Sequence, residues 1–327
     1  MIHSDAAKVA ILHGAVPPDA SPDERDSLVQ VEAVSAALQR LGYAPEPVPF
    51  SLDLESVQHA LQRLDPAFVF NLVESVAGSG QLIHLAPALL DYLGLRYTGS
   101  RTEALFITSN KILAKKQLTA WGIATPLWFS LSQTDDASGQ LIPPYIIKSV
   151  WEHASIGLDG DSVVVEPQSP IPLLQQRHRR YGGEWFAEAY IEGREFNLSL
   201  LADGKDPQVL PPAEIRFVDY PHGKPKIVDY RAKWEPNSFE YRHTARSFDF
   251  SAEDSPLLRQ LRDIALACWH GFELRGYARV DLRVDRNHQP WVLEVNANPC
   301  LAPDSGFIAA AQRTGLSFDQ VIARLVA

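Results

Sequence analysis

Near its C-terminus the chain carries YARVDLRVDRNHQPWVLEVN, residues 277–296, a stretch that predicts two strands joined by a polar turn. Two strands with so short a link form an antiparallel hairpin. Successive side chains of a strand point to opposite faces, so each strand has one polar and one apolar face. The polar face carries Arg279, Asp281, Arg283, Glu294 and Asn296, and the apolar face carries Val280, Leu282, Val284, Leu293 and Val295.

Three side chains of the polar face are oxygen donors: Asp281, Glu294 and Asn296. Two carboxylates and an amide oxygen suit a hard divalent cation, most simply Mg²⁺. Carboxylates at neighbouring positions repel each other unless a cation lies between them. On the residues alone, a metal site and a solvated face of an edge hairpin remain equally open interpretations.

The composition places the hairpin in an ordinary globular protein. The chain has 327 residues, of which 46% are hydrophobic and 21% charged, which excludes disordered, collagen-like and disulfide-scaffold classes. At roughly 100–200 residues per domain, we expect two or three domains. The formal net charge of −10 disfavours nucleic acid as a partner, because non-specific binding needs a cationic face. The two cysteines indicate a reducing compartment.

The N-terminal residues Met1-Ile2-His3-Ser4-Asp5 lack the basic start and apolar core of a signal peptide. No apolar run approaches the roughly 18–20 residues that span a bilayer. We therefore expect a cytoplasmic protein without a membrane partner.

The first hundred residues alternate strand and helix patterns. Strands are expected at 9–12, 48–50 and 68–70, with helices between them. Ser21, Pro22 and Glu24 form a capping box that starts the first helix, and Gly42 ends it. Alternating strands and helices predict a doubly wound parallel sheet.

Beyond residue 100 the pattern changes to that of a small α+β unit. A helix is expected from Ser109 to Trp121, then short strands with one helix near residues 173–180. The polar stretch 211–246 has no clear assignment, and a long stretch of this kind is usually a functional loop.

A second candidate site begins at Lys148, at the end of an apolar strand, and continues through the small residues 154–157. Backbone N–H groups of such a loop can hold phosphate oxygens, with the lysine adding a point charge. Taken alone the pattern is weak, and an ordinary surface loop is the favoured interpretation.

The order of these pieces resembles the ATP-grasp superfamily, and within it the D-alanine–D-alanine ligase family, over nearly the whole chain. The segments that carry the resemblance are Leu93-Gly94-Leu95-Arg96-Tyr97-Thr98-Gly99-Ser100, Asn110-Lys111 with Lys115, Trp121-Gly122-Ile123-Ala124-Thr125-Pro126, Glu188-Ala189-Tyr190-Ile191-Glu192-Gly193-Arg194-Glu195-Phe196, Asp229-Tyr230-Arg231-Ala232-Lys233, Arg279-Val280-Asp281 and Glu294-Val295-Asn296-Ala297-Asn298-Pro299. Together, in this order and spacing, they make a chance resemblance unconvincing.

The resemblance implies a three-domain ATP-grasp fold, with α/β and α+β parts. The domains are an N-terminal doubly wound α/β domain (1–105), a central domain (106–186) and a C-terminal domain with the metal site (187–327). It implies an ATP- and Mg²⁺-dependent carboxylate–amine ligase that acts on small amino-acid-like substrates through an acyl phosphate, and a homodimer. Two alternatives stay open: a ligase that forms an ester with a hydroxy acid, and a nucleotide-binding regulatory protein without catalysis.

The resemblance also implies roles for individual residues. The nucleotide site would comprise Lys111, Lys148, Ala154, Ser155, Ile156, Gly157, Glu188, Ala189, Tyr190, Ile191, Glu195 and Leu293. The catalytic groups would be Arg279, Lys233 and Ser155, and the metal ligands Asp281, Glu294 and Asn296. Phosphoryl transfer to a carboxylate joins two anions, so a metal and cationic side chains must offset their repulsion.

Departures from the family pattern concentrate at the expected substrate site. Ala154 stands where the family has Ser, and Trp234 where it has Tyr. Alanine cannot hydrogen-bond, and tryptophan offers only an N–H donor. Cys300 replaces a family glycine, and a packing role is more plausible for it than a nucleophilic one. The other expected substrate contacts are Asp26, Glu74 and Ser305, with His13 as a further candidate.

Overall fold

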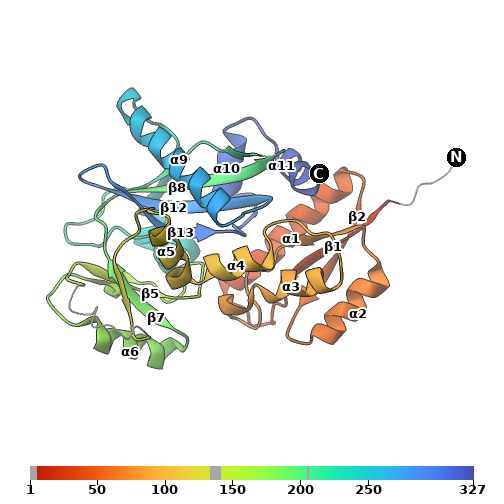
Figure 1. Ribbon diagram of the computed structural model, residues 1–327, viewed down its shortest axis with the longest axis horizontal. Coiled ribbons are helices and arrows are strands. Elements are labelled where there is room, and N and C mark those ends of the chain that lie inside the picture. Colours follow the sequence, from red (N-terminus) through yellow and green to blue (C-terminus); the bar gives the residue numbers. More distant parts are fainter. Residues whose placement is uncertain (1–5, 133–140, 205) are drawn as a thin grey trace.

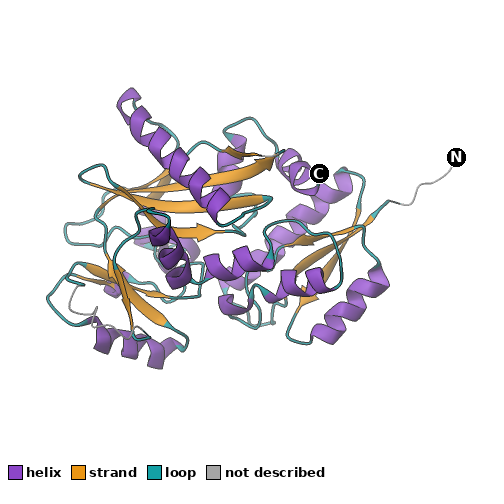
Figure 2. Ribbon diagram, in the orientation of Figure 1, coloured by secondary structure: helices purple, strands orange, loops and turns teal. Residues whose placement is uncertain are grey.

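The computed structural model describes residues 6–132, 141–204 and 206–327. Residues 1–5, on which the expectation of no signal peptide rests, lie outside this range. The described chain builds three sheets, seen as orange strands in Figure 2, with helices around them. None of the described helices is long and apolar enough to cross a membrane.

The N-terminal sheet is parallel, with strand order β2-β1-β3. Its elements are β1 (Lys8–Gly14), α1 (Pro22–Arg40), β2 (Ala44–Phe50), α2 (Leu54–Leu64), β3 (Phe68–Asn71), the 3-10 turn η1 (Gly80–Leu82) and α3 (Leu85–Tyr92). Helix α1 packs on one face with Val31 and Val34, whereas α2 and α3 pack on the other with Leu61 and Leu90. The predicted doubly wound arrangement is therefore confirmed.

The expected start of α1 is confirmed in detail. Ser21 and Glu24 form the capping box, and the Ser21 amide donates to Glu24 Oε2 at 2.8 Å. Pro22 occupies the first turn, where its missing N–H costs nothing. The chain leaves the helix through Gly42, whose φ of +88° favours glycine. This start matters for function because the first turn of α1 reaches a cavity described below.

A small antiparallel sheet follows, with strand order β4-β7-β5-β6. Its strands are β4 (Trp128–Ser130), β5 (Tyr145–Ser149), β6 (Val163–Val164) and β7 (Trp185–Ala189), and the helices before and within it are α4 (Thr102–Ser109), α5 (Lys111–Ala120), the 3-10 turn η3 (Gly160–Ser162) and α6 (Pro170–Tyr181). The helix expected from Ser109 to Trp121 is confirmed as α5, whereas α4 before it was not expected. Asn110 separates the two helices, because its side chain accepts from the Leu113 amide at 2.9 Å and caps α5.

The large sheet has the order β11-β10-β8-β12-β13, with β9 pairing to β8. Its elements are β8 (Gly193–Asp203), β9 (Asp206–Val209), β10 (Ala213–Phe217), α7 (Tyr230–Trp234), α8 (Phe239–His243), β11 (Thr244–Ser247), the 3-10 turn η4 (Ala252–Asp254), α9 (Ser255–Gly271), β12 (Tyr277–Asp285) and β13 (Pro290–Asn296), followed by α10 (Gly306–Gln312) and α11 (Phe318–Val326). The predicted hairpin is confirmed as β12–β13, and the unassigned stretch 211–246 contains β10, α7, α8 and the start of β11.

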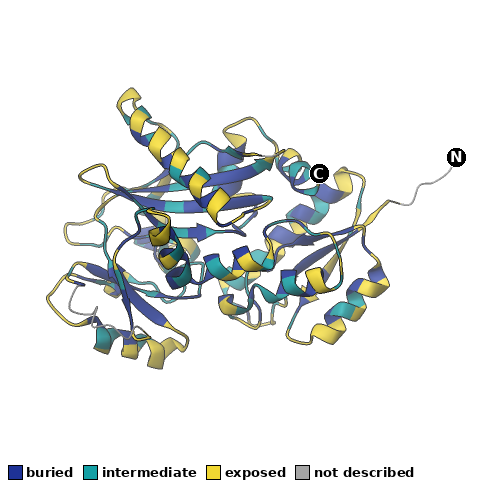
Figure 3. Cartoon of the chain, in the orientation of Figure 1, coloured by how far each residue is buried: buried dark blue, intermediate teal, exposed yellow. Residues whose placement is uncertain are grey.

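The last two helices join the ends of the chain. In Figure 1, α11 lies beside α1, so the C-terminal segment contacts the N-terminal unit. Phe307 and Ile322 from this segment share one core with Val34 of α1 and Leu201 of β8. Figure 3 shows the same pattern, with buried strands and helices whose outer faces are exposed. The N-terminal and large sheets are thereby held against each other.

The expected domain limits fall inside two elements. Residue 105 lies within α4, and residue 186 lies within β7, which pairs with β4 and β5 up to Ala189. The three sheets themselves span residues 8–71, 128–189 and 193–296. The division into three domains stays a prediction.

Candidate active site

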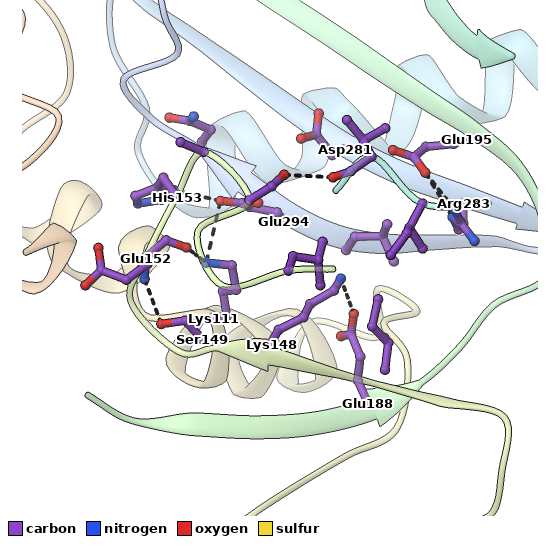
Figure 4. A pocket seen from close by; sticks show the side chains of 18 of the residues that line it. Lys111, Lys148, Ser149, Glu152, His153, Glu188, Glu195, Asp281, Arg283 and Glu294 are labelled. Atoms are coloured by element: carbon purple, nitrogen blue, oxygen red, sulfur yellow. Dashed lines mark hydrogen bonds and ion pairs between the residues drawn. The ribbon is translucent and has the colours of Figure 1, made fainter. Parts of the chain in front are cut away.

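Two adjoining cavities meet over the polar face of the large sheet. The first, shown in Figure 4, lies between the small and the large sheet. Of the residues expected at the nucleotide, it is lined by Lys111, Lys148, Ala154, Ser155, Ile156, Glu188, Ala189, Tyr190, Ile191, Glu195 and Leu293. It is also lined by Lys233, Arg279, Asp281, Glu294 and Asn296. The structure thus brings together residues from distant parts of the chain.

The floor of this cavity comes from the pairing of β12 with β13. The pairing shifts between Asp281, which faces Glu294, and Leu282, which faces Val292. Leu293 is therefore the extra residue of a β-bulge, which re-aims side chains next to it. Val292 and Val295 enter the core, whereas Leu293 and Glu294 both line the cavity. Strict alternation, which placed Leu293 on the apolar face, was wrong at this position.

A buried ion-pair cluster lies at one wall. Glu188, with a side chain 1% exposed, lies 2.7 Å from Lys115 Nζ and 2.5 Å from Lys148 Nζ. Burial alone would raise the pKa of Glu188, but the two ammonium groups outweigh it and lower the pKa. With both lysines protonated, the cluster carries one net positive charge. Lys148, 19% exposed, presents that charge to the cavity, where it can attract an anion.

A second cluster surrounds Glu294. Its Oε1 lies 2.8 Å from His153 Nδ1 and 3.9 Å from Lys111 Nζ, as Figure 4 shows. Burial would raise the pKa of Glu294, but Lys111, His153 and Arg279 hold it well below its usual value. Glu294 therefore stays anionic. His153, which directly precedes the small residues 154–157, orients this carboxylate.

The three candidate metal ligands lie on the cavity side of the hairpin. Asp281 accepts from Arg279 Nε at 2.7 Å and from Asn197 Nδ2 at 2.7 Å, and Asn296 Oδ1 accepts from the Asn298 amide. Within the part of the chain that the structure describes, no group of three or more His, Cys, Asp or Glu side chains is placed to hold a metal ion. Two carboxylates and an amide still fit Mg²⁺, which usually keeps several waters and takes its other ligands from substrate phosphates. The metal assignment stays a prediction.

Two loops cover the cavities. The loop 153–158 turns through Ala154 and Ser155, whose φ values are +57° and +61°. Ser155 Oγ donates to the carbonyl of Val228 at 2.7 Å, and Trp234 Nε1 donates to the carbonyl of Ala154 at 3.0 Å. The loop around α7 therefore lies on the loop 153–158, and residues of both loops line both cavities.

Two residues of the α7 region extend this cover. The Tyr230 hydroxyl donates to Asp23 Oδ1 at 2.8 Å, which joins the loop to the first turn of α1. Lys233 lines both cavities. The cavity walls desolvate Lys233 and lower its pKa, and the like charge of Arg279 adds to the effect, although the side chain is still reached by solvent.

The second cavity has a volume of about 840 Å³ and extends from the hairpin to the start of α1. It is lined by the residues expected at the substrates, Asp26, Glu74, Trp234, Cys300 and Ser305. Its wall also includes Arg279 and Lys233, which it shares with the first cavity. Pockets of roughly 300–1,000 Å³ hold whole small-molecule ligands, so this space exceeds the needs of one alanine.

An acidic cluster closes one end of the second cavity. Gln30, 1% exposed, donates from Nε2 to Glu74 Oε1 at 2.7 Å and to Asp26 Oδ2 at 3.3 Å. Burial raises the pKa of Glu74, Gln30 opposes the rise and Asp26 adds to it, so that the pKa is about 7. Two neighbouring carboxylates that share one neutral donor favour a cationic ligand.

Cys300 belongs to the same end. Its thiol donates to Asp26 Oδ2 at 3.1 Å, and its sulfur accepts from the Ala302 amide. Burial, together with Glu74 and Asp26, raises the pKa of Cys300 well above its usual value. The thiol therefore stays protonated at neutral pH, which favours the packing role over the nucleophilic one.

Two predicted positions lie outside these cavities. Gly157 packs against Trp185, where an added Cβ would lie 2.5 Å from the ring, and its φ is +69°. His13 is buried and pairs with the adjacent carbonyl of Gly14, so the structure does not bring it to the substrate cavity.

Sequence reasoning gave no role to several residues of the site. Arg283 binds Glu195 Oε2 at 2.8 Å, and alternation had placed it on the polar face. Asn197, paired with Asp281 across the sheet, could have been found from the same alternation in β8. Arg246 lies in the stretch that had no assignment, so no sequence pattern indicated it.

Comparison with known proteins gives the chain its family. The model of the D-ala D-ala ligase C-terminus matches residues 119–327. A D-alanine–D-alanine ligase of Moorella thermoacetica is 30% identical over 329 residues, which cover 98% of this chain and 98% of that protein. An uncharacterised protein of Sinorhizobium fredii is 30% identical over 296 residues, covering 89% and 84%.

A solved structure agrees on the fold. D-alanine–D-alanine ligase from Bacillus anthracis, complexed with ATP, superposes with a TM-score of 0.76 at 22% identity, covering 98% of this chain and 96% of that chain. The chain belongs to the D-alanine–D-alanine ligase family, and the expected ATP-grasp fold is confirmed. Its class is that of an ATP-dependent ligase, and the two alternative functions are not favoured.

The Glu188 cluster yields a stability prediction. Glu188→Gln should destabilise the protein by about 3–5 kcal/mol, because it leaves Lys115, 1% exposed, without its counter-charge. Urea unfolding at pH 7 measures the change. Glu192→Gln, which makes the same chemical change at an ion pair whose carboxylate is 66% exposed, is the control and should cost less than about 1 kcal/mol. Equal stability of both variants would contradict the prediction.

Proposed function

We propose that this ligase uses ATP and Mg²⁺ to join the carboxylate of one small amino-acid-like substrate to the amine of another. The observation that carries the proposal is the junction of the two cavities. Lys233, Arg279 and Asp281 line both, so a nucleotide phosphate and a substrate carboxylate can meet there. ATP supplies the phosphoryl group that makes an acyl phosphate, and Mg²⁺ offsets the phosphate charge.

The chain's own residues supply the electrostatics. Lys111 and Lys148 bring positive charge to the phosphate side of the first cavity, and Glu195 and Glu188 border the rest of the nucleotide. Arg279 is a half-buried cation held by Asp281 at 2.7 Å, so its position is fixed before the substrates arrive. It stabilises the oxyanion that forms when an amine attacks the acyl phosphate.

The covering loops protect the intermediate. An acyl phosphate hydrolyses if water reaches it, so a ligase must exclude water while the amine attacks. The bonds from Ser155 to Val228 and from Trp234 to Ala154 keep the two loops together above the junction. Ser155 thus contributes by holding the loop 153–158 against the loop around α7; these two loops form the lid over the junction.

Further expectations belong to the same proposal. We propose that the three sheets correspond to three domains, that the enzyme is a homodimer in the cytoplasm, and that its partners are small molecules and not nucleic acid. The net charge of −10 supports the last point. Light scattering of the purified protein tests the dimer.

The general test is a phosphate-release screen. Purified enzyme with ATP and Mg²⁺ is offered pairs of amino acids of both chiralities, and pairs of an amino acid with a hydroxy acid. Release that requires both a carboxylate and an amine supports the proposal. Release with hydroxy acids alone would move the function to ester formation.

Lys148→Ala should weaken ATP binding. It removes a charge-assisted contact of about 1.5–3 kcal/mol, or roughly ten- to a hundredfold in Kd. Calorimetry with a non-hydrolysable ATP analogue measures the change. An unchanged Kd would mean that the loop after β5 has only a structural role.

Glu294→Gln should abolish ATP turnover and leave the fold intact, because it keeps the shape of the side chain and removes the charge that holds the cation. Circular dichroism checks the fold, and coupled ADP release measures turnover. Glu192→Gln, on the exposed face, is the matched control and should remain active. Full activity of Glu294→Gln would refute the metal assignment.

D-Alanine should be a poor first substrate, and a bulkier or less polar carboxylic acid should be preferred. Ala154 offers no hydrogen-bonding side chain, and the Trp234 N–H is already bonded to the Ala154 carbonyl. Asp26 and Glu74 are the remaining contacts for an ammonium group. The measurement is kcat/KM for D-alanine against the best acid of the screen.

Restoring the family residues provides the matched variant. Ala154→Ser combined with Trp234→Tyr should raise the residual activity with D-alanine, because a site with unpaired polar groups discriminates by hydrogen bonds. If the unchanged enzyme makes D-alanyl-D-alanine as its fastest product, this account of the substrate site is wrong.

A further inference from the structure

Arg283 is a buried cation of the first cavity for which the mechanism above has no use. Its side chain is 4% exposed, and in the pairing of β12 with β8 it lies opposite Glu195. Both residues line the first cavity, and Figure 4 shows their side chains pointing toward each other. A cation so far withdrawn from water needs partners, and the partners of Arg283 indicate what it holds in place.

The guanidinium of Arg283 joins three segments of the chain. Its Nε and Nη2 atoms donate to Glu195 Oε2 at 3.1 and 2.8 Å. Nη1 donates to the carbonyl of Ile191, between β7 and β8, at 2.9 Å, and Nη2 also donates to the carbonyl of Lys226, which precedes α7. The Tyr190 hydroxyl donates to the same Lys226 carbonyl at 3.2 Å. Arg283 therefore fixes β8, the link before it and the base of the loop around α7 relative to one another.

The pairing of Arg283 with Glu195 leaves one carboxylate oxygen free. Arg279 engages both oxygens of Asp281, with Nε on Oδ1 and Nη2 on Oδ2, which is the usual parallel pairing. At Glu195, by contrast, Oε2 accepts both bonds. In the described stretches of the chain, no group donates a hydrogen bond to Glu195 Oε1. Because Glu195 lines the cavity, this oxygen is available to a donor on a ligand.

The position of Glu195 indicates which part of ATP it meets. Glu195 lies two residues along β8 from Asn197, which pairs with the candidate metal ligand Asp281. At about 3.4 Å per residue, Glu195 is about 7 Å along the strand from the level of the predicted metal site. Phosphates at that site have no hydrogen-bond donors to offer, and the next group of ATP is the ribose, which has two hydroxyls. The sugar is therefore the donor that Glu195 Oε1 can meet.

We propose that Arg283 is a positioning residue that aims Glu195 Oε1 at the sugar hydroxyls and so selects ribonucleotides over deoxyribonucleotides. The proposal rests on the ligase function proposed above. A hydroxyl that donates to a fixed carboxylate oxygen makes a charge-assisted bond, whereas a deoxy sugar leaves that oxygen unpaired. A site built around a hydrogen bond strongly rejects the analogue that lacks the donor.

The competing interpretation is that Arg283 only ties the strands and the loop around α7 together. A structural tie would weaken the binding of every nucleotide to the same extent, whereas the proposed role acts on the difference between ribose and deoxyribose. The ratio of two dissociation constants therefore separates the two roles. The same hairpin offers a matched control, because Arg286 pairs with Glu192 at 2.7 Å but has a side chain that is 78% exposed.

The test measures the binding of ADP, 2′-deoxy-ADP and 3′-deoxy-ADP by calorimetry in the presence of Mg²⁺. Without the other substrates, these nucleotides bind and are not turned over. In the unchanged enzyme we expect the Kd for ADP to be at least tenfold below that of the weaker deoxy nucleotide. Arg283→Met should reduce this ratio to about twofold or less, and Arg286→Met should keep it.

Arg283→Lys covers the case in which Arg283→Met does not fold. The lysine keeps a positive charge beside Glu195, but its ammonium is a point charge and lacks the planar fork that fixes the carboxylate. This variant should fold, which circular dichroism checks, and should lower the same ratio at least threefold.

A ratio near one in the unchanged enzyme, or a ratio that a folded Arg283 variant keeps, would overturn the proposal while leaving the ligase function in place. An equal loss in Arg286→Met would also overturn it, because the effect would not depend on the buried pair. The phosphate-release screen tests the ligase function separately. The expected ratios together with no phosphate release from any donor and acceptor would refute that function and support the role of Arg283.

Discussion

The one-residue shift in the pairing of β12 with β13 decides which side chains face the active site. Without the extra residue at Leu293, the alternation fixed at Val295 and Asn296 would turn Leu293 into the core and leave only Glu294 on the cavity side. With it, Val292 and Val295 both fill the core while Leu293 and Glu294 both line the cavity. An apolar side chain and a carboxylate thus adjoin on the cavity side of the hairpin, which suits the proposed nucleotide because its base and its phosphates need different surroundings.

The carboxylates around the cavities are stable in the folded protein because cationic side chains balance their charges. Glu188 is neutralised by Lys115 and Lys148, and Asp281 by Arg279. A buried charge without a partner costs several kcal/mol, which is why these buried carboxylates have cationic partners. Lys233 and Arg246 differ from them, because both line the second cavity as exposed cations that water solvates.

Sequence patterns predicted the parts of the fold that follow from local rules. Period-two alternation gave the β12–β13 hairpin, and capping chemistry gave the start of α1 at Ser21. The bulge at Leu293 depends on how two strands meet, and no local pattern encodes it. The helix expected from Ser109 begins at Lys111, because the side chain of Asn110 caps it.

The residues of the candidate site also fall into two groups, those that a local sequence pattern predicts and those that it does not. Residues on regular strands, such as Asp281 and Glu294, were predicted because their face follows from position, whereas Arg246 was missed because β11 lies in a stretch without periodicity.

The departures at Ala154 and Trp234 are two ends of one contact, because the indole N–H of Trp234 donates to the Ala154 carbonyl. A donor that holds the lid cannot also hold a substrate, so the bond that closes the cavity removes a polar contact from the substrate inside it. In the proposed function, the ammonium group of the substrate is bound instead at the acidic end by Asp26 and Glu74, which Gln30 holds in place through hydrogen bonds. We therefore propose that recognition of the first substrate rests on charge at one wall, which tolerates larger side chains than a close set of hydrogen bonds would.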